Sequence, residues 1–152
     1  MKTTSFLLIV VFGIFFVGCK KEQPLKEYIV HSWQTTYLKL EMPTYKKSDS
    51  LHVYEDKFDN NPEFIAQSKY NADGTFSAWF LNTKGEHVSN ADGTWKVKND
   101  SLFVAFFYNN RNMKVRYFIT KTEEGFLGKS TYDWDEDGDF DDLLTMKTKL
   151  IK

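Results

Sequence analysis

Residues 133–142, which read DWDEDGDFDD, combine residue types and a spacing that could bind a metal ion. With Asp133 as position 1, carboxylates fall at positions 1, 3, 5 and 9, a glycine at position 6, and position 7 offers a backbone carbonyl. Calcium-binding loops use this oxygen-ligand spacing, because alternate side chains converge and the glycine permits a sharp bend. The candidate ligands are Asp133, Asp135, Asp137, Asp139, Asp141 and Asp142.

A solvated acidic turn that holds no ion is the alternative interpretation of the same stretch. Position 12, where calcium loops carry a bidentate Glu, is Leu144, so Asp141 or Asp142 would have to complete the ligand shell. The flanking residues have the pattern of strands. If calcium binds, we therefore expect a structural ion of modest affinity that staples a hairpin.

Catalytic motifs are sparse in this sequence. His31, His52 and His87 are scattered, and none has a second histidine or a cysteine at ligand spacing. The sequence contains no Gly-x-Ser-x-Gly motif and no glycine-rich phosphate loop. We therefore expect a protein that is not an enzyme, with calcium as its one candidate cofactor. A formal net charge of −1 gives no electrostatic case for a nucleic-acid partner.

The single cysteine, Cys19, directly follows a short apolar segment. Lys2 supplies a positive start, residues 6–17 are apolar or glycine, and Gly18 is the small residue that a signal peptidase needs. A helix of this length would span about 18 Å, and the hydrocarbon core of a bilayer is roughly 30 Å thick. The segment therefore predicts a signal peptide over residues 1–18 and disfavours a membrane-spanning helix.

The string Val17-Gly18-Cys19 resembles the lipobox of bacterial lipoproteins, with Phe16 where that pattern usually has Leu. The resemblance implies that Cys19 carries a lipid and anchors the protein in the bacterial cell envelope, on the periplasmic face or the outer-membrane surface. The polar residues 19–27 then form the lipidated cysteine and its tether. The alternative is an ordinary signal peptide followed by a chance cysteine. With no second cysteine, stability must come from packing.

Residues 28–152 have the composition of an all-β domain, rich in aromatic residues and poor in proline. Alternating apolar residues and turn signals predict strands at 32–40, 75–81, 94–98, 102–108, 113–120, 126–134 and 143–150. The irregular region 41–67 is expected to hold a short strand at 51–54 and a helical turn at 62–66. Short loops predict an antiparallel up-and-down meander that closes into a barrel of about eight strands, since closure removes exposed edges.

One string occurs twice, as Asn-Ala-Asp-Gly-Thr-aromatic at residues 71–76 and again at 90–95. Each Asp-Gly is expected to form a turn that leads into an aromatic strand. The strings DGTF (73–76), GTWKV (93–97) and DSL (100–102), with Trp33 in the first strand, resemble the lipocalin-like domains of small Bacteroidetes lipoproteins. The lipocalin signature has Gly two residues before that Trp, where this chain has His31, so the likeness is to the broad lipocalin-like group. It implies a barrel whose cup takes a small apolar ligand.

The abundant aromatic residues have two interpretations, as packed core or as the lining of that cup. We select Trp79 and Trp95 as candidate lining residues. The strand 102–107 is apolar on both faces, which indicates that residues 41–67 cover it or that it meets a ligand or partner. The expected function is non-catalytic binding of a small apolar ligand at the membrane. The alternative is a protein-interaction or structural module of the envelope with a solidly packed barrel.

Overall fold

The computed structural model describes residues 23–58 and 64–152, so Cys19 and the predicted signal peptide lie outside the described residues. The described part contains a helix, α1 (Leu25–Ile29), and a 3-10 turn, η1 (Tyr45–Lys47). Its strands are β1 (Ser32–Met42), β2 (His52–Asp56), β3 (Ile65–Tyr70), β4 (Thr75–Leu81), β5 (His87–Lys98), β6 (Ser101–Tyr108), β7 (Arg111–Lys121), β8 (Phe126–Tyr132) and β9 (Asp142–Leu150).

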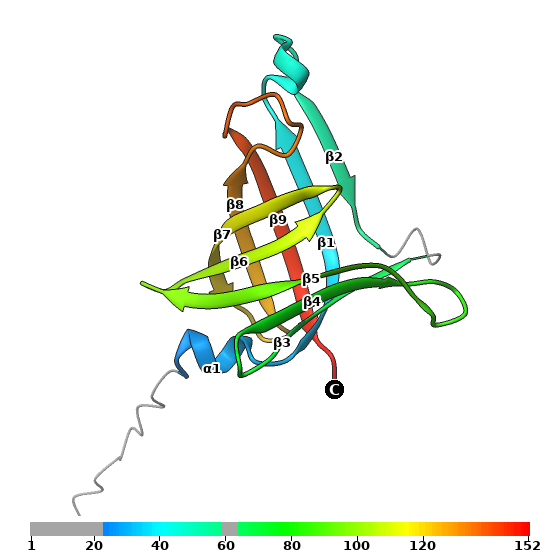
Figure 1. The fold of residues 1–152 in the computed structure, drawn as a ribbon, viewed down its shortest axis with the longest axis vertical. Helices are drawn as coiled ribbons and strands as arrows, with labels where there is room; N and C mark the ends of the chain where they lie inside the picture. The colour runs from blue at the N-terminus through cyan, green and yellow to red at the C-terminus, as the bar shows by residue number, and fades with distance from the viewer. Residues whose placement is uncertain (1–22, 59–63) are drawn as a thin grey trace, which may run out of the picture.

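Eight of these strands form a closed antiparallel barrel, and β2 is an extra strand beside it (Figure 1). The barrel order is β1-β3-β4-β5-β6-β7-β8-β9, and β9 pairs back with β1 from Leu143 to Leu150. Each barrel strand thus pairs with the barrel strands that precede and follow it in the sequence. Strand β2, which comes between β1 and β3 in the sequence, lies outside the ring. The predicted meander and its closure into about eight strands are confirmed.

Strand β1 changes partner along one of its edges. Residues Ser32–Gln34 pair with β3, whereas Leu38–Met42 pair with β2. Residues 35–37 form no ladder pair with β2 or β3, although β9 continues along the opposite edge. The part of β1 that follows Gln34 is therefore separated from β3. The space between the two strands belongs to the candidate site.

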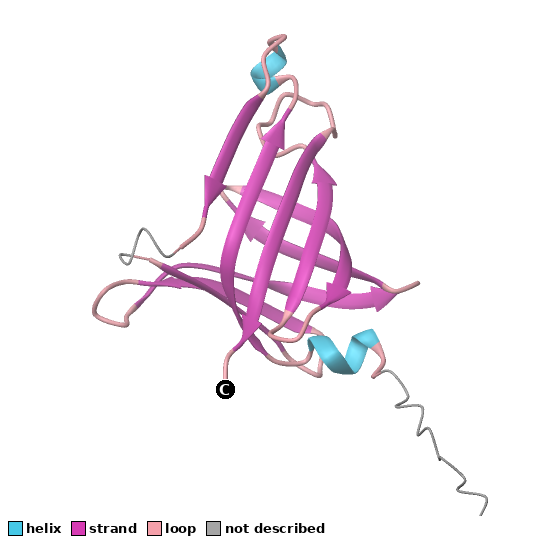
Figure 2. Cartoon of the chain, turned by 180° about the vertical axis from the view of Figure 1, so that it is seen from behind, coloured by secondary structure: helices cyan, strands magenta, loops and turns pink. Residues whose placement is uncertain are grey.

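Helix α1 closes one end of the barrel (Figure 2). Leu25 and Ile29 are buried, and Trp33 Nε1 donates a hydrogen bond to the Ile29 carbonyl at 3.0 Å. The Trp33 ring meets the edge of Phe126 with their centroids 5.0 Å apart. The predicted tether to residue 27 is therefore too long. The packed domain begins at Leu25 instead of residue 28, because two apolar residues four apart share one helix face.

Strand β3 was not predicted, and the helical turn expected at 62–66 is wrong for Ile65 and Ala66, which begin this strand. Residues 62 and 63 lie outside the described residues. The inward-facing positions of β3 are Ala66, Ser68 and Tyr70, so small and polar residues stand where a buried strand normally has large apolar ones. The apolar alternation that signals a strand is therefore weak here.

The two Asp-Gly pairs behave differently. Gly74 lies in a turn with φ of +88°, as predicted. Gly93 lies inside β5, paired with Phe76 on one side and Phe106 on the other, so the second predicted turn is wrong. A Cβ at Gly93 would lie 2.0 Å from the Ala105 carbonyl oxygen, so this glycine permits a close approach of β5 to β6.

The strand with two apolar faces, β6, turns Leu102 and Val104 into the core and Phe103 and Phe107 outward. The strand residues 52–56 and 65–67 pair with β1 and β4, away from β6, and Phe107 remains 54% exposed. The expectation that this region covers the outer face of β6 is therefore not met.

Candidate functional site

The barrel encloses a cavity of about 240 Å³, which we call the inner chamber. Aromatic rings from four strands and from the loop after β8 contribute to its wall: Tyr70, Phe76, Phe80, Phe106, Tyr117 and Trp134. Small residues on inward-facing positions, among them Ala66, Ala78 and Ala91, leave the space that these rings surround. The closed end beneath it is filled by the core around Trp33 and Trp95.

A second cavity of about 410 Å³, the outer chamber, lies where β1 separates from β3. Tyr54 and Asp56 of β2, Phe58 and Phe64 contribute to its wall, together with residues of β1, β4 and β5. Five residues line both chambers: Thr35, Leu38, Ala66, Phe80 and Ser89. The two chambers are therefore neighbouring parts of one apolar site.

The wall of the inner chamber carries no charged residue among those described. Its polar groups are hydroxyls, the side-chain amide of Gln67 and the indoles of Trp79 and Trp134. Burial raises the pKa of Tyr70 and of Tyr117 well above the usual range of a phenol. Both hydroxyls therefore stay neutral at physiological pH and can donate or accept hydrogen bonds.

Trp134 brings an unpaired donor to the same wall. It lines the inner chamber, and its Nε1 is buried without a hydrogen-bond acceptor among the described residues. The ring packs against Tyr132 with a centroid separation of 5.2 Å. A buried donor without a partner costs about 1–3 kcal/mol, so an acceptor that reached this N–H would be stabilised by the hydrogen bond.

The two tryptophans selected from the sequence occupy different positions. Trp79 is among the residues that line the inner chamber, where its indole stacks on His87 at 4.8 Å and donates to Gln67 Oε1 at 3.1 Å. Trp95 is 6% exposed and packs in the core, where its Nε1 donates to the Asn71 carbonyl at 2.9 Å. Trp95 therefore does not form the predicted lining of either chamber.

The acidic loop lies at the other end of the barrel from α1 (Figure 1). Three of the six candidate carboxylates, those of Asp133, Asp135 and Asp142, place one oxygen each within 4.8 Å of one another. Asp142 is 1% exposed and accepts hydrogen bonds from the backbone N–H groups of Trp134 at 2.6 Å and Asp135 at 3.2 Å. Burial raises the pKa of Asp142 above its ordinary value.

The other candidate carboxylates turn toward the connection between β1 and β2 or toward solvent. Asp137 accepts from the backbone N–H groups of Asp139 at 2.8 Å and Lys47 at 3.2 Å, and these bonds lower its pKa. Asp141 accepts a hydrogen bond from the Thr44 hydroxyl at 3.4 Å, and Asp139 is exposed. The loop is thus held by residues about 90 positions earlier in the chain, which local spacing could not reveal.

The chain matches no family model and no curated protein. Within the described ranges, no helix is both long and apolar enough to cross a membrane. The lipobox and the lipocalin-like resemblance therefore stay predictions, and the barrel and its chambers carry the functional argument.

The three histidines lie apart, each beside an aromatic ring. His31 is 6.0 Å from Trp33, His52 stacks on Tyr45 at 4.6 Å, and His87 stacks on Trp79. None of them lines either chamber. Their positions therefore give the chambers no general base.

Proposed function

We propose that this protein is a membrane-anchored, non-catalytic binding protein whose barrel takes a small apolar ligand. The observation that carries the proposal is the apolar site formed by the two chambers. Small-molecule sites are apolar cavities of roughly 300–1,000 Å³ with a few placed polar groups. The outer chamber, of about 410 Å³, falls in this range, and the inner chamber of about 240 Å³ adjoins it. A barrel built only for structure would fill this space with side chains.

The lipid anchor in this proposal rests on the sequence around Cys19. Because α1 closes one end of the barrel, a lipid on Cys19 would attach that closed end to the membrane. The outer chamber borders β2, which pairs with the end of β1 (Leu38–Met42) that lies away from the helix-proximal residues Ser32–Gln34. Ligand would then be exchanged away from the anchored end.

Filling the inner chamber tests the proposed binding. Ala78 lies on its wall, so Ala78→Phe adds an aromatic ring to the space that a ligand would occupy. We expect the purified protein to bind the neutral fluorescent probe N-phenyl-1-naphthylamine at one site, and the variant to bind it at least tenfold more weakly. The thermal unfolding midpoint should stay the same or rise.

The matched control is Lys69→Phe, which adds the same ring to an exposed position on β3. This variant should bind the probe as the unmodified protein does. Absence of probe binding by the unmodified protein, together with native mass spectra that reveal no co-purified ligand, would contradict the proposal.

A protein-interaction module remains the alternative function, and one surface favours it. Phe107 and Phe118 are 54% and 55% exposed on the outer face of β6 and β7. The Arg116 guanidinium lies 4.4 Å from the Phe118 ring centroid and 5.7 Å from that of Phe103. If this surface is the functional one, Phe118→Ser should abolish partner binding and leave probe binding unchanged.

Calcium is proposed as a structural ion of the acidic loop. Asp133, Asp135 and Asp142 would supply oxygen ligands, and the ion would relieve the repulsion among their charges. Because η1 donates backbone hydrogen bonds to the same loop, the ion would also fix the connection between β1 and β2.

A further inference from the structure

We propose that the two chambers select an uncharged apolar chain that carries an acceptor oxygen, such as an ester or alcohol, and discriminate against the corresponding carboxylate. This inference rests on the proposed function and names the chemical class of its ligand. It follows from the placement of one buried donor and one carboxylate on an otherwise uncharged wall.

The inner chamber favours a neutral oxygen. Trp134, whose buried Nε1 has no acceptor among the described residues, lines this wall together with Tyr70 and Tyr117. An ester, ketone or alcohol oxygen can accept from such groups and loses little hydration in entering. An ionised carboxylate would lose its hydration with no lysine or arginine among the described lining residues to compensate for it.

The outer chamber disfavours an anion for a different reason. Asp56 is the one charged residue among the described residues that line either chamber. Asp56 pairs in the strand register with Leu38, which also lines the site. The Asp56 carboxylate accepts hydrogen bonds from the Phe58 N–H at 2.7 Å and the Tyr54 hydroxyl at 3.3 Å. These bonds hold the Asp56 carboxylate at the outer chamber.

A chain molecule that spans the two chambers therefore has no favourable place for a carboxylate. With its charged end inward, it meets neutral groups, and with that end outward, it meets Asp56. Repulsion between two like charges a few ångströms apart near a protein surface weakens binding by about tenfold or more. A primary amine at the outer end is attracted to Asp56 instead.

Competition against N-phenyl-1-naphthylamine at pH 8 tests this selection with one chain length and four end groups. The competitors are methyl decanoate, decan-1-ol, decylamine and decanoate. We expect the ester, the alcohol and the amine to bind at least tenfold more tightly than decanoate. Decanoate binding as tight as that of the ester would overturn the inference and leave the proposed function intact, whereas failure of the probe and of all four competitors to bind would overturn both.

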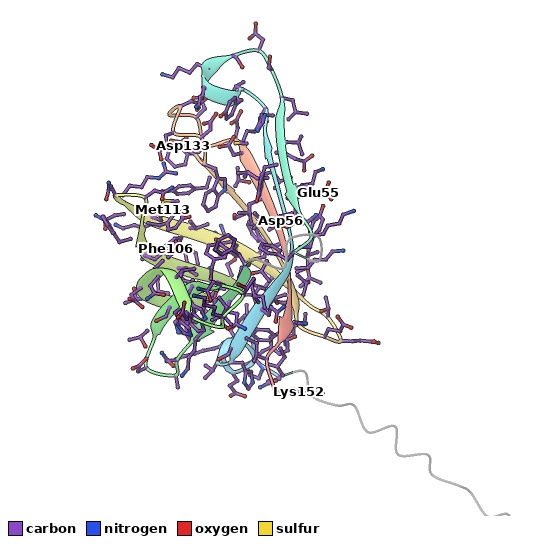
Figure 3. All side chains as sticks on the ribbon, turned by 90° about the vertical axis from the view of Figure 1, so that its right-hand side faces the viewer. Glu55, Asp56, Phe106, Met113, Asp133 and Lys152 are labelled. Atoms are coloured by element: carbon purple, nitrogen blue, oxygen red, sulfur yellow. The ribbon has the colours of Figure 1, made fainter. Side chains whose placement is uncertain are left out.

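Two adjacent residues of β2 provide the matched variants (Figure 3). Asp56 faces the outer chamber, and Glu55, one position earlier, faces the opposite side and is exposed. Asp56→Lys should tighten decanoate binding at least tenfold and change ester binding by less than twofold, whereas Glu55→Lys should change neither. Equal effects of the two variants would overturn the role of Asp56.

Milder substitutions protect the test against misfolding. Asp56→Asn keeps an acceptor oxygen for the Phe58 N–H, offers its NH2 group as a donor to the Tyr54 hydroxyl oxygen and removes the charge, and it should still improve decanoate binding several-fold. Trp134→Phe removes the unpaired donor and should weaken binding of methyl decanoate about three- to tenfold, with binding of decane, which has no acceptor, unchanged. Equal losses for ester and decane would contradict the hydrogen bond.

Discussion

Replacing Gly93 with alanine provides a stringent test of the barrel geometry. The added Cβ would lie 2.0 Å from the Ala105 oxygen and 2.8 Å from the Phe106 Cα, both backbone atoms that cannot rotate away. To restore an ordinary contact of 3.4 Å, β5 and β6 must separate locally by about 1.4 Å. A displacement of that size breaks the ladder hydrogen bonds at this point, because such bonds weaken beyond about 3.2 Å.

Loss of two such bonds, with buried backbone groups left unpaired, amounts to about 3 kcal/mol of unfolding free energy. For a domain of this size, that corresponds to a fall of about 10 °C in the thermal midpoint. Circular dichroism during heating and urea titration measure both quantities.

Gly85→Ala is the control, because a Cβ there meets nothing within 4 Å. Its cost is only the positive φ of +76°, about 1 kcal/mol. If the two variants are equally stable, the close approach of β5 to β6 is refuted.

Three further predictions concern α1 and the acidic loop. Trp33→Phe removes the hydrogen bond to the Ile29 carbonyl and leaves that buried oxygen unpaired. Urea titration should therefore reveal a loss of about 1–3 kcal/mol in the free energy of unfolding. A loss below about 0.5 kcal/mol would mean that the bond does not hold α1. Calcium should raise the thermal midpoint relative to chelator, and Asp133→Asn with Asp135→Asn should abolish the shift; no shift in the unmodified protein excludes the ion. Burial raises the folded pKa of Asp142, so its contribution to stability is full below the unfolded value and falls as the pH rises through the folded one. In chelator, Asp142→Asn should therefore gain stability over the unmodified protein as the pH rises above the ordinary pKa of an aspartate, and a difference that does not vary with pH would contradict this.

The sequence predicts well those elements whose two faces differ in polarity. In β7, Val115 and Tyr117 alternate with charged residues, so the strand and its inward face follow from a period of two. Strand β3 lacks that contrast, because Ala66 and Ser68 face the chambers. The small residues that make the binding space are the same ones that weaken the strand signal.

Lining residues were harder to predict than strands. Trp79 lines the inner chamber, whereas Trp95, a residue of the same size and also on a strand, packs in the core. Trp134 follows β8 in the acidic loop, and its unpaired Nε1 depends on packing between distant segments. The contacts of Thr44 and Lys47 with the loop join residues about 90 positions apart, and no local pattern encodes them.

The change of partner along β1 has a consequence for motion. Strand β2 is held to the sheet by five register pairs with β1 on the edge that the barrel ring does not use there, since β9 pairs with the opposite edge. Detaching β2 therefore breaks no strand pairing of the eight-stranded ring. We expect β2 to form a separate cooperative unit of lower stability. Its amide protons should exchange faster than those of β1. If a ligand binds beside β2 as proposed, its residence time is governed by the free energy of this local opening, independently of the global stability of the barrel.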